Sequence, residues 1–142
     1  PVLLTIAASF SLGVALEKTG VAAHFAAGLV FISQGNPVLL LIFMYTAVSL
    51  LTETITNNAA AVIMVPLALA VTQQAGLDPE PFMLAIMIAA SASFATPLGY
   101  QTNLMVYGPG AYRFSDFLRV GVPMNLLVGA TALITLILLY PL

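Results

Sequence analysis

Apolar runs separated by short polar interruptions make up the whole chain. They cover residues 2–16, 21–32, 37–51, 59–71, 82–95 and 117–140. An α-helix needs about 20 apolar residues to cross the hydrocarbon core of a bilayer, and only the last run reaches that length by itself. The run at 2–16 predicts a truncated opening helix, and the run at 21–32 predicts a short connecting helix. Pro37 follows a turn at 33–36 and suits the first position of the next helix.

The first unusual interruption is residues 51–58 (LTETITNN), between the apolar runs 37–51 and 59–71. Each of these runs is shorter than a membrane span, and both together are too long for one helix. The pattern predicts a re-entrant helical hairpin at 37–74, with the Thr/Asn cluster at its tip and both ends on one side of the membrane. Two ordinary spans joined by a polar loop are the alternative. Against that alternative, the interruption contains no Gly, Pro or Lys, which a loop in water normally carries.

A second polar interruption follows the run at 82–95. It contains Ser91, Ser93, Thr96, Pro97, Gly99, Gln101, Thr102 and Asn103. Pro97 lacks a backbone donor and Gly99 relaxes φ, so we expect the helix to break at 96–99. Residues 80–108 therefore predict one discontinuous helix. Residues 101–103 either continue a polar lining or satisfy the unwound backbone. In the closing helix at 117–140, Gly121, Pro123 and Asn125 predict a kink or close packing.

The composition places these helices in a membrane. Of 142 residues, 61% are hydrophobic and 6% are charged, and the mean hydropathy is +1.10. Soluble domains carry about 25% charged residues, so this chain could not cover a water-facing surface. A soluble core buried in a larger assembly is the alternative. The sequence has no basic patch or aromatic ladder for nucleic acid, and its lack of cysteine excludes disulfides, thiolate nucleophiles and zinc–thiolate sites.

The two ends of the chain lie against apolar sequence. It begins at Pro1 instead of Met and ends at Leu142, directly after an apolar run. It also lacks the basic start and short apolar core of a signal peptide. We therefore expect the sequence to be a piece of a longer membrane protein.

Polar, unwound backbone at membrane depth has a restricted set of uses. It is tolerated where it lines a cavity or is buried by protein. Helix N-termini favour an anion, and unwound carbonyls favour a hard cation such as sodium. Residues 52, 54 and 56 contribute threonine hydroxyls, and Asn57 and Asn58 contribute amide donors and acceptors. Because no nucleophile has a neighbouring base and no His/carboxylate cluster is present, the pattern favours a secondary transporter over an enzyme.

The residues that carry these features also resemble a known family. Residues 51–58 with Ala95-Thr96-Pro97 and 107–110 (YGPG) resemble the second half of the divalent anion/sodium symporter family, within the wider ion transporter superfamily. The resemblance implies an all-α transmembrane fold in which residues 1–142 are the C-terminal one of two inverted repeats. The repeat would comprise an opening helix at 2–16, a connecting helix at 21–32, a hairpin at 37–74, a broken helix at 80–108 and a closing helix at 117–140.

The resemblance also implies roles for single residues. Thr56-Asn57-Asn58 falls on the family's Ser-Asn-Thr hairpin tip with only the central Asn retained. Backbone oxygens of Thr52, Ile55 and Ala95 are expected at a sodium ion, and Asn57 at both sodium and substrate. Contacts to the anionic substrate are expected from Thr56 and Asn58, with the opposite wall formed by Thr96 and Pro97. The N-terminal repeat would supply the other half of the site. A homodimer in a bacterial inner membrane, with sodium and no further cofactor, is the implied setting.

Glu53 is the only acidic or basic residue within a polar interruption. It is either a coupling or proton-linked carboxylate, or a helix-end carboxylate that structures the hairpin, and we favour the second interpretation. Three alternative functions are consistent with the whole pattern. They are sodium-coupled uptake of a dicarboxylate, tricarboxylate or sulfate; cation/proton antiport or arsenite-type permeation; and a non-transporting membrane scaffold or channel subunit. Arg113 and Arg119 predict a cytoplasmic loop, which would open the hairpin to the outside.

Overall fold

The regular secondary structure is helical throughout the part of the chain that is described. A computed structural model describes residues 7, 11, 14–16 and 18–140. Its helices are α2 (Val21–Ile32), α3 (Pro37–Thr52), α4 (Asn57–Ala75), α5 (Glu80–Ser91), α6 (Gln101–Tyr107) and α7 (Phe114–Leu139). The prediction of an all-α protein is confirmed. The expected opening helix at 2–16 lies largely outside the described residues.

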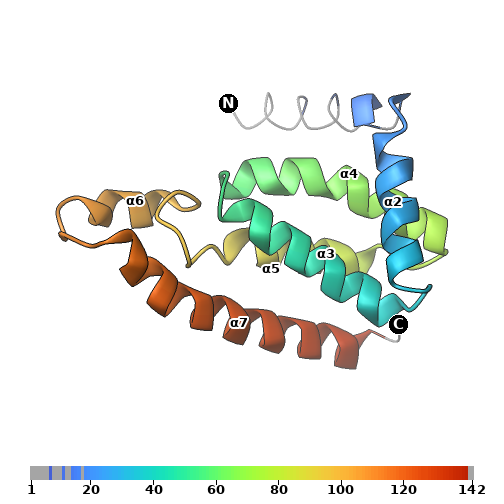
Figure 1. The fold of residues 1–142 in the computed structure, drawn as a ribbon. Coiled ribbons are helices and arrows are strands. Elements are labelled where there is room, and N and C mark those ends of the chain that lie inside the picture. Colours follow the sequence, from blue (N-terminus) through green and yellow to red (C-terminus); the bar gives the residue numbers. More distant parts are fainter. Residues whose placement is uncertain (1–6, 8–10, 12–13, 17, 141–142) are drawn as a thin grey trace.

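Helices α3 and α4 fold back on each other at a turn formed by residues 53–56 (Figure 1). The Asn36 side chain caps α3 by accepting from the Val38 and Leu39 amides, at 3.0 and 3.3 Å. Helix α4 is longer than the predicted arm at 59–71, because it begins at Asn57 and continues through the polar residues 72–74. Its 19 residues make it, with α7, one of two described helices long and apolar enough to cross a membrane. The expectation of two short arms is therefore wrong for α4.

Helix α5 packs against α3 and α4, and a non-helical segment at 92–100 separates it from α6. The helix ends at Ser91, several residues before the predicted break at 96–99. Residues 101–103, which the sequence left open, begin α6. We call residues 92–100 the α5–α6 break. Figure 1 shows this segment beside the α3–α4 turn and between α6 and α7.

One buried face of α3 leads directly to the turn. Its buried residues are Leu40, Leu41, Met44, Tyr45, Val48 and Thr52. This spacing of three to four residues places them along one side of the helix. All of them except Thr52 pack in a core with Phe82, Ile86 and Ala89 of α5. Because Thr52 continues the same face, its hydroxyl and carbonyl lie inside the protein where α5 ends.

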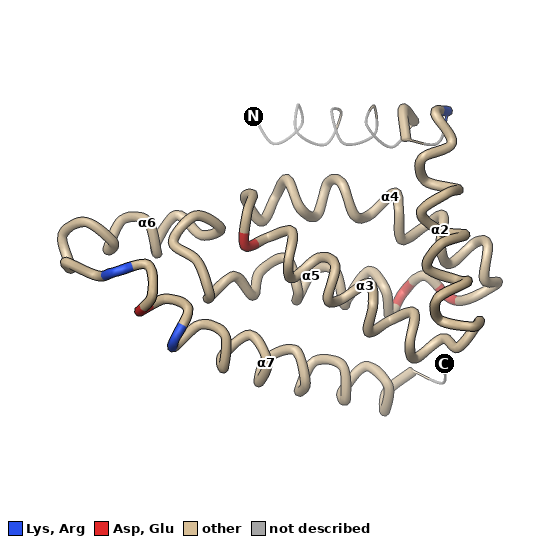
Figure 2. The backbone as a smooth tube through the Cα atoms, in the orientation of Figure 1, with Lys and Arg blue, Asp and Glu red and all other residues tan. Residues whose placement is uncertain are grey.

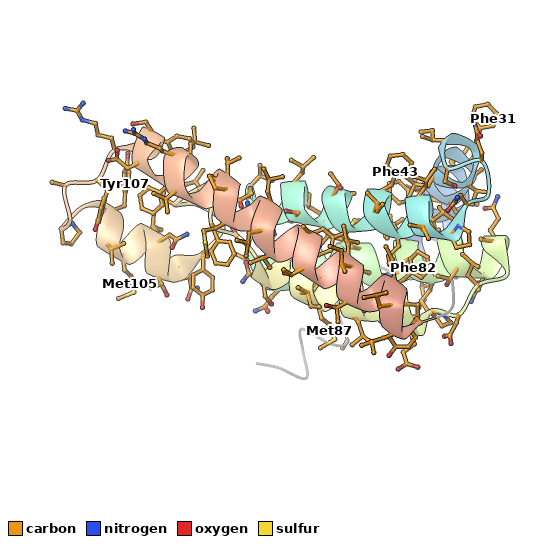
Figure 3. The ribbon with its side chains drawn as sticks, turned by 90° about the horizontal axis from the view of Figure 1, so that it is seen from below. Phe31, Phe43, Phe82, Met87, Met105 and Tyr107 are labelled. Carbon is orange, nitrogen blue, oxygen red and sulfur yellow. The ribbon has the colours of Figure 1, made fainter. Side chains whose placement is uncertain are left out.

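Large apolar side chains also cover much of the outer surface. Phe31, Met87 and Met105 are 83%, 65% and 74% exposed, and Figure 3 shows them projecting outward. Charged residues lie mainly near the start of α7 and around the α4–α5 connection, whereas one acidic position stands apart at the α3–α4 turn (Figure 2). An apolar exterior with charge near its ends suits a protein surrounded by lipid.

Candidate functional site

The α3–α4 turn and the α5–α6 break are joined by reciprocal side-chain hydrogen bonds. The buried Thr52 hydroxyl donates to the Ala90 carbonyl at 2.8 Å, where α5 ends. In return, the Ser93 hydroxyl donates to the Thr52 carbonyl at 3.1 Å, and the Thr96 hydroxyl donates to the Glu53 carbonyl at 2.6 Å. Hydroxyls of each segment thus satisfy carbonyls that unwinding leaves without a helical donor.

Asn57, the first residue of α4, extends this junction to the far part of the break. Its amide nitrogen faces Thr52 Oγ1 at 3.0 Å and the carbonyl oxygens of Ala90 and Gly99, both at 3.1 Å. This orientation is assigned from the network, because the opposite one would set the amide oxygen against carbonyl oxygens. The side-chain oxygen of Asn57 then points away from these acceptors.

The Glu53 carboxylate accepts hydrogen bonds from two elements, the α5–α6 break and α7. Its Oε1 accepts from the backbone amides of Phe94 and Ala95, both at 3.1 Å, and from the Asn125 side-chain nitrogen of α7. Its Oε2 lies 3.4 Å from the Ser93 hydroxyl. Glu53 is 9% exposed, so these donors replace water around the carboxylate. The contacts are those of the helix-end carboxylate that we favoured from the sequence.

Two glycines allow the backbones to approach so closely. A Cβ at Gly99 would lie 2.0 Å from Ser93 Oγ and 2.2 Å from the Thr52 carbonyl oxygen. A Cβ at Gly121 of α7 would lie 2.0 Å from the Phe94 carbonyl oxygen. The expectation that Gly99 relaxes φ is wrong, since its φ is not positive. Missing side-chain volume, not backbone freedom, explains both glycines.

Asn103 of α6 forms hydrogen bonds with backbone carbonyls of the break. Its amide nitrogen donates to the carbonyl oxygens of Ser93 and Thr96, at 3.2 and 3.1 Å. Asn103 therefore fits one of the two alternatives for residues 101–103, because it satisfies unwound backbone. Gln101 and Thr102 are exposed. The sequence offered no signal for which carbonyls it would reach.

Several backbone carbonyls at the junction accept no hydrogen bond from the described residues, and two of them belong to predicted sodium ligands. Neither the Ile55 oxygen in the turn nor the Ala95 oxygen in the break accepts a hydrogen bond from any residue that the structure describes. Ala95 is 5% exposed, and a buried carbonyl is rarely left without a partner. Both were expected as backbone ligands of sodium.

The remaining predicted residues lie at the same junction with different exposure. Thr56 is exposed and caps α4 by accepting from the Ala59 amide at 3.4 Å. Asn58 is also exposed, whereas Pro97 is buried within the break. The structure therefore connects Thr52, Asn57 and Thr96 by hydrogen bonds to the opposite segment. Within residues 18–140 it gives no such contact for Thr56 or Asn58.

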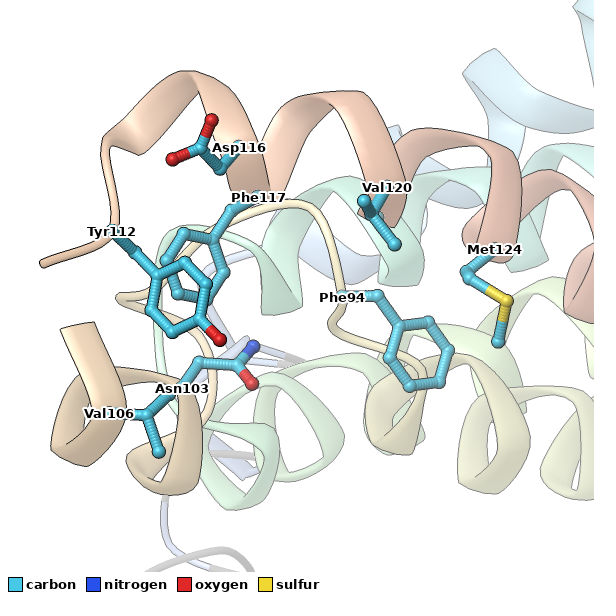
Figure 4. Close-up of a pocket in the computed structure, with 9 residues that line it drawn as sticks. Phe94, Asn103, Val106, Tyr112, Asp116, Phe117, Val120 and Met124 are labelled. Carbon is cyan, nitrogen blue, oxygen red and sulfur yellow. The ribbon is translucent and has the colours of Figure 1, made fainter. Parts of the chain in front are cut away.

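A separate pocket of about 400 Å³ lies on the other side of the break, between α6 and α7 (Figure 4). It is lined by Phe94, Asn103, Val106, Tyr112, Asp116, Phe117, Val120, Gly121 and Met124. Most of these side chains are apolar, and none belongs to the α3–α4 turn. The pocket is therefore distinct from the predicted substrate and sodium residues.

Sequence comparison relates the chain to transporters along its whole length. The sequence profile of the family described as "Citrate transporter" matches residues 1–142. The chain is similar to an uncharacterized transporter of Synechocystis, with 43% identity over 98% of this chain and 23% of that protein. Sodium/sulfate cotransporter 1 of Chlamydomonas reinhardtii is 46% identical over 87% of this chain and 14% of its own length. An uncharacterized transporter of Escherichia coli is 37% identical over 99% of this chain and 23% of its length. The chain thus spans less than a quarter of each of these relatives.

Proposed function

The chain belongs to the citrate transporter family, and we propose that it forms half of the binding site of a sodium-coupled anion carrier. The family and the relatives agree with the resemblance to divalent anion/sodium symporters, which is confirmed. Membership points to transport in a membrane and not to enzymatic catalysis. The substrate class that we propose is a dicarboxylate, a tricarboxylate or sulfate, with sodium as the coupling ion.

The observation that carries this proposal is that the Ile55 and Ala95 carbonyls, one from each segment, are among those at the junction that accept no hydrogen bond from the described residues. The Ile55 and Ala95 oxygens, together with the outward oxygen of the Asn57 amide, provide neutral oxygen ligands from both segments. Hard cations bind oxygen, and unwound carbonyls bind sodium in transporters built from broken helices. The Thr52 carbonyl already accepts from Ser93, but a carbonyl has a second lone pair and can still bind a cation.

The anion would bind beside this cation, at the start of α4. The N-terminus of this 19-residue helix leaves backbone N–H groups without intrahelical acceptors and carries a partial positive charge. Exposed Thr56 and Asn58 lie at this terminus, and Thr96 and Pro97 would form the facing wall of the site. A sodium ion at the junction would add full positive charge to the same place. No arginine occurs in residues 51–58 or 91–103, so helix N–H groups and amides would replace a guanidinium.

Transport into proteoliposomes tests the function. We expect the full-length protein to accumulate at least one of labelled sulfate, succinate or citrate under an inward sodium gradient. Replacing sodium with choline should abolish accumulation, and a pH gradient without sodium should not restore it. Accumulation driven by the pH gradient alone would instead support the antiporter or arsenite-type interpretation. No sodium-dependent uptake of any of the three anions would refute the proposed substrate class.

We also propose that the chain is one of two inverted repeats, with the hairpin tip near mid-depth of the membrane. Glu53 in the turn contacts Asn125, which lies near the middle of the 26-residue helix α7. If α7 crosses the bilayer, the turn cannot be an aqueous loop at its surface. An N-terminal repeat of the same protein would provide the facing half-site, and two such proteins would form a dimer in the bacterial inner membrane.

Cysteine labelling distinguishes this re-entrant hairpin from two full spans. Gln74→Cys, Thr54→Cys and Ser115→Cys place single thiols at exposed positions on α4, on the turn and on α7, and this sequence has no cysteine of its own. A bulky, membrane-impermeant thiol reagent should label residue 74 from one side and residue 115 from the other. Residue 54 should react far more slowly than residue 115. Labelling of residue 54 from the side of residue 115, at the same rate, would show an aqueous loop.

A further inference from the structure

Glu53 is not one of the proposed sodium or anion ligands, although its side chain forms the most hydrogen bonds of any at the junction. It forms no salt bridge with a basic group in the described part of the chain. Its Oε1 instead gathers three N–H donors, two from the backbone of the break and one from α7. A buried carboxylate costs free energy unless its oxygens are satisfied, as these are.

We propose that Glu53 and Asn125 are positioning residues that hold the Ala95 carbonyl in the proposed sodium site. This inference rests on the proposed function. The amides of Phe94 and Ala95 both point to Glu53 Oε1, which fixes the orientation of the peptide planes on either side of residue 94. The Thr96 hydroxyl fixes the following residue through the Glu53 carbonyl. Ala95 lies between these anchors, and its own oxygen is left free for a cation.

Asn125 aligns this arrangement with α7. Its side-chain oxygen accepts from the Phe94 amide at 3.3 Å, while its nitrogen donates to Glu53 Oε1. Gly121 lies one turn earlier on the same face of α7 and lets the helix backbone contact the break. One amide therefore touches both the carboxylate and the peptide that the carboxylate orients. Loss of either partner would free the 93–96 backbone without removing any proposed ligand.

The geometry separates this role from that of a coupling carboxylate. The groups around Oε1 are all donors, and a glutamine oxygen can accept from the same three N–H groups. Its amide nitrogen, in place of Oε2, could donate to the Ser93 oxygen. Glu53→Gln therefore preserves the hydrogen-bond frame and removes the charge. Glu53→Ala removes both.

The test is equilibrium binding of the labelled anion to the purified full-length transporter over a range of sodium concentrations. We expect Glu53→Ala and Asn125→Ala to raise the sodium concentration for half-maximal anion binding by about tenfold or more. Anion affinity at saturating sodium should change much less. Glu53→Gln should stay within about threefold of the unmodified protein, as should the controls Glu80→Gln and Thr131→Ala. Both control positions are exposed, Glu80 at the start of α5 and Thr131 on α7.

The possible results distinguish failure of the positioning role from failure of the proposed function. If Glu53→Gln is as defective as Glu53→Ala, the charge matters and the positioning role is overturned. Unchanged sodium dependence in Asn125→Ala would also overturn it. Where Glu53→Ala does not insert stably, Asn125→Ala carries the test, because it removes only one of the three donors to Oε1. Anion binding by the unmodified protein that ignores sodium would refute the proposed coupling, whereas sodium-dependent binding with unaffected variants would refute this inference alone.

Discussion

Asn57→Ala is expected to abolish anion transport by the full-length protein while leaving expression and membrane insertion intact. The Asn57 amide nitrogen joins α4 to Thr52 and to the carbonyls of Ala90 and Gly99, and its oxygen is the proposed side-chain ligand for sodium. Loss of a hydrogen bond to a charged group costs about 1.5–3 kcal/mol, which corresponds to roughly a tenfold to hundredfold weakening. Because one amide serves the junction and the ion, the substitution removes both contributions.

Initial uptake at an anion concentration below half-saturation measures this effect. Gln74→Ala is the matched control, since it removes an exposed amide from the other end of the same helix. Asn57→Asp separates the two functions of the amide, because it keeps a side-chain oxygen and loses the N–H donors to Ala90 and Gly99. Normal uptake by Asn57→Ala at low anion concentration would show that the binding site lies elsewhere.

The helix pattern could be predicted wherever local chemistry fixed it. Asn36 and Pro37 predict the start of α3, and an apolar run interrupted only by His24 predicts α2 with the bounds that the structure has. Pro97 and Gly99 predict an end of α5 that is too late, because they are not the first cause of unwinding. Tertiary hydrogen bonds to Glu53 and Thr52 hold residues 93–96 out of the helix before Pro97 is reached.

The connections within the site could not be predicted from a single sequence. Glu53 and Asn125 lie far apart in the chain, and apolar periodicity does not specify how one helix is aligned along another. A partial signal existed, because an isolated amide inside an apolar membrane helix usually has a polar partner. Gly121, one turn before Asn125, indicated the face on which that partner would approach. What the sequence lacked was the identity of the partner.

Sodium is expected to raise the affinity of the full-length protein for its anion, and the anion to raise the affinity for sodium by the same factor. An ion bound by the Ile55 and Ala95 carbonyls and the Asn57 amide would link the α3–α4 turn to the α5–α6 break. That link would order the start of α4, where we propose that the anion binds. Typical couplings of about 1–3 kcal/mol correspond to a roughly 5- to 150-fold change in affinity, and their reciprocity is a thermodynamic requirement.

Side-chain substitutions should affect this coupling unequally. Changes at Ile55 and Ala95 should have little effect unless added bulk blocks the site, because these residues contribute backbone oxygens. Thr52→Val should weaken the coupling, since it removes the hydroxyl that donates to Ala90 and accepts from Asn57. Thr46→Val on the same helix is the control, because its exposed hydroxyl binds only the Ile42 carbonyl one turn away.

Equilibrium binding of the labelled anion, with sodium replaced by choline at constant ionic strength, measures whether sodium raises the anion affinity. The expected result is a weaker anion affinity in choline for the unmodified protein and for Thr46→Val, and a smaller difference between the two salts for Thr52→Val. Equal affinity in sodium and choline would mean that the junction does not bind the coupling ion. In that case a pH titration of anion binding would follow, because protons are the next candidate for the driving ion. Glu53, the only carboxylate within either polar interruption, would be the first residue to test.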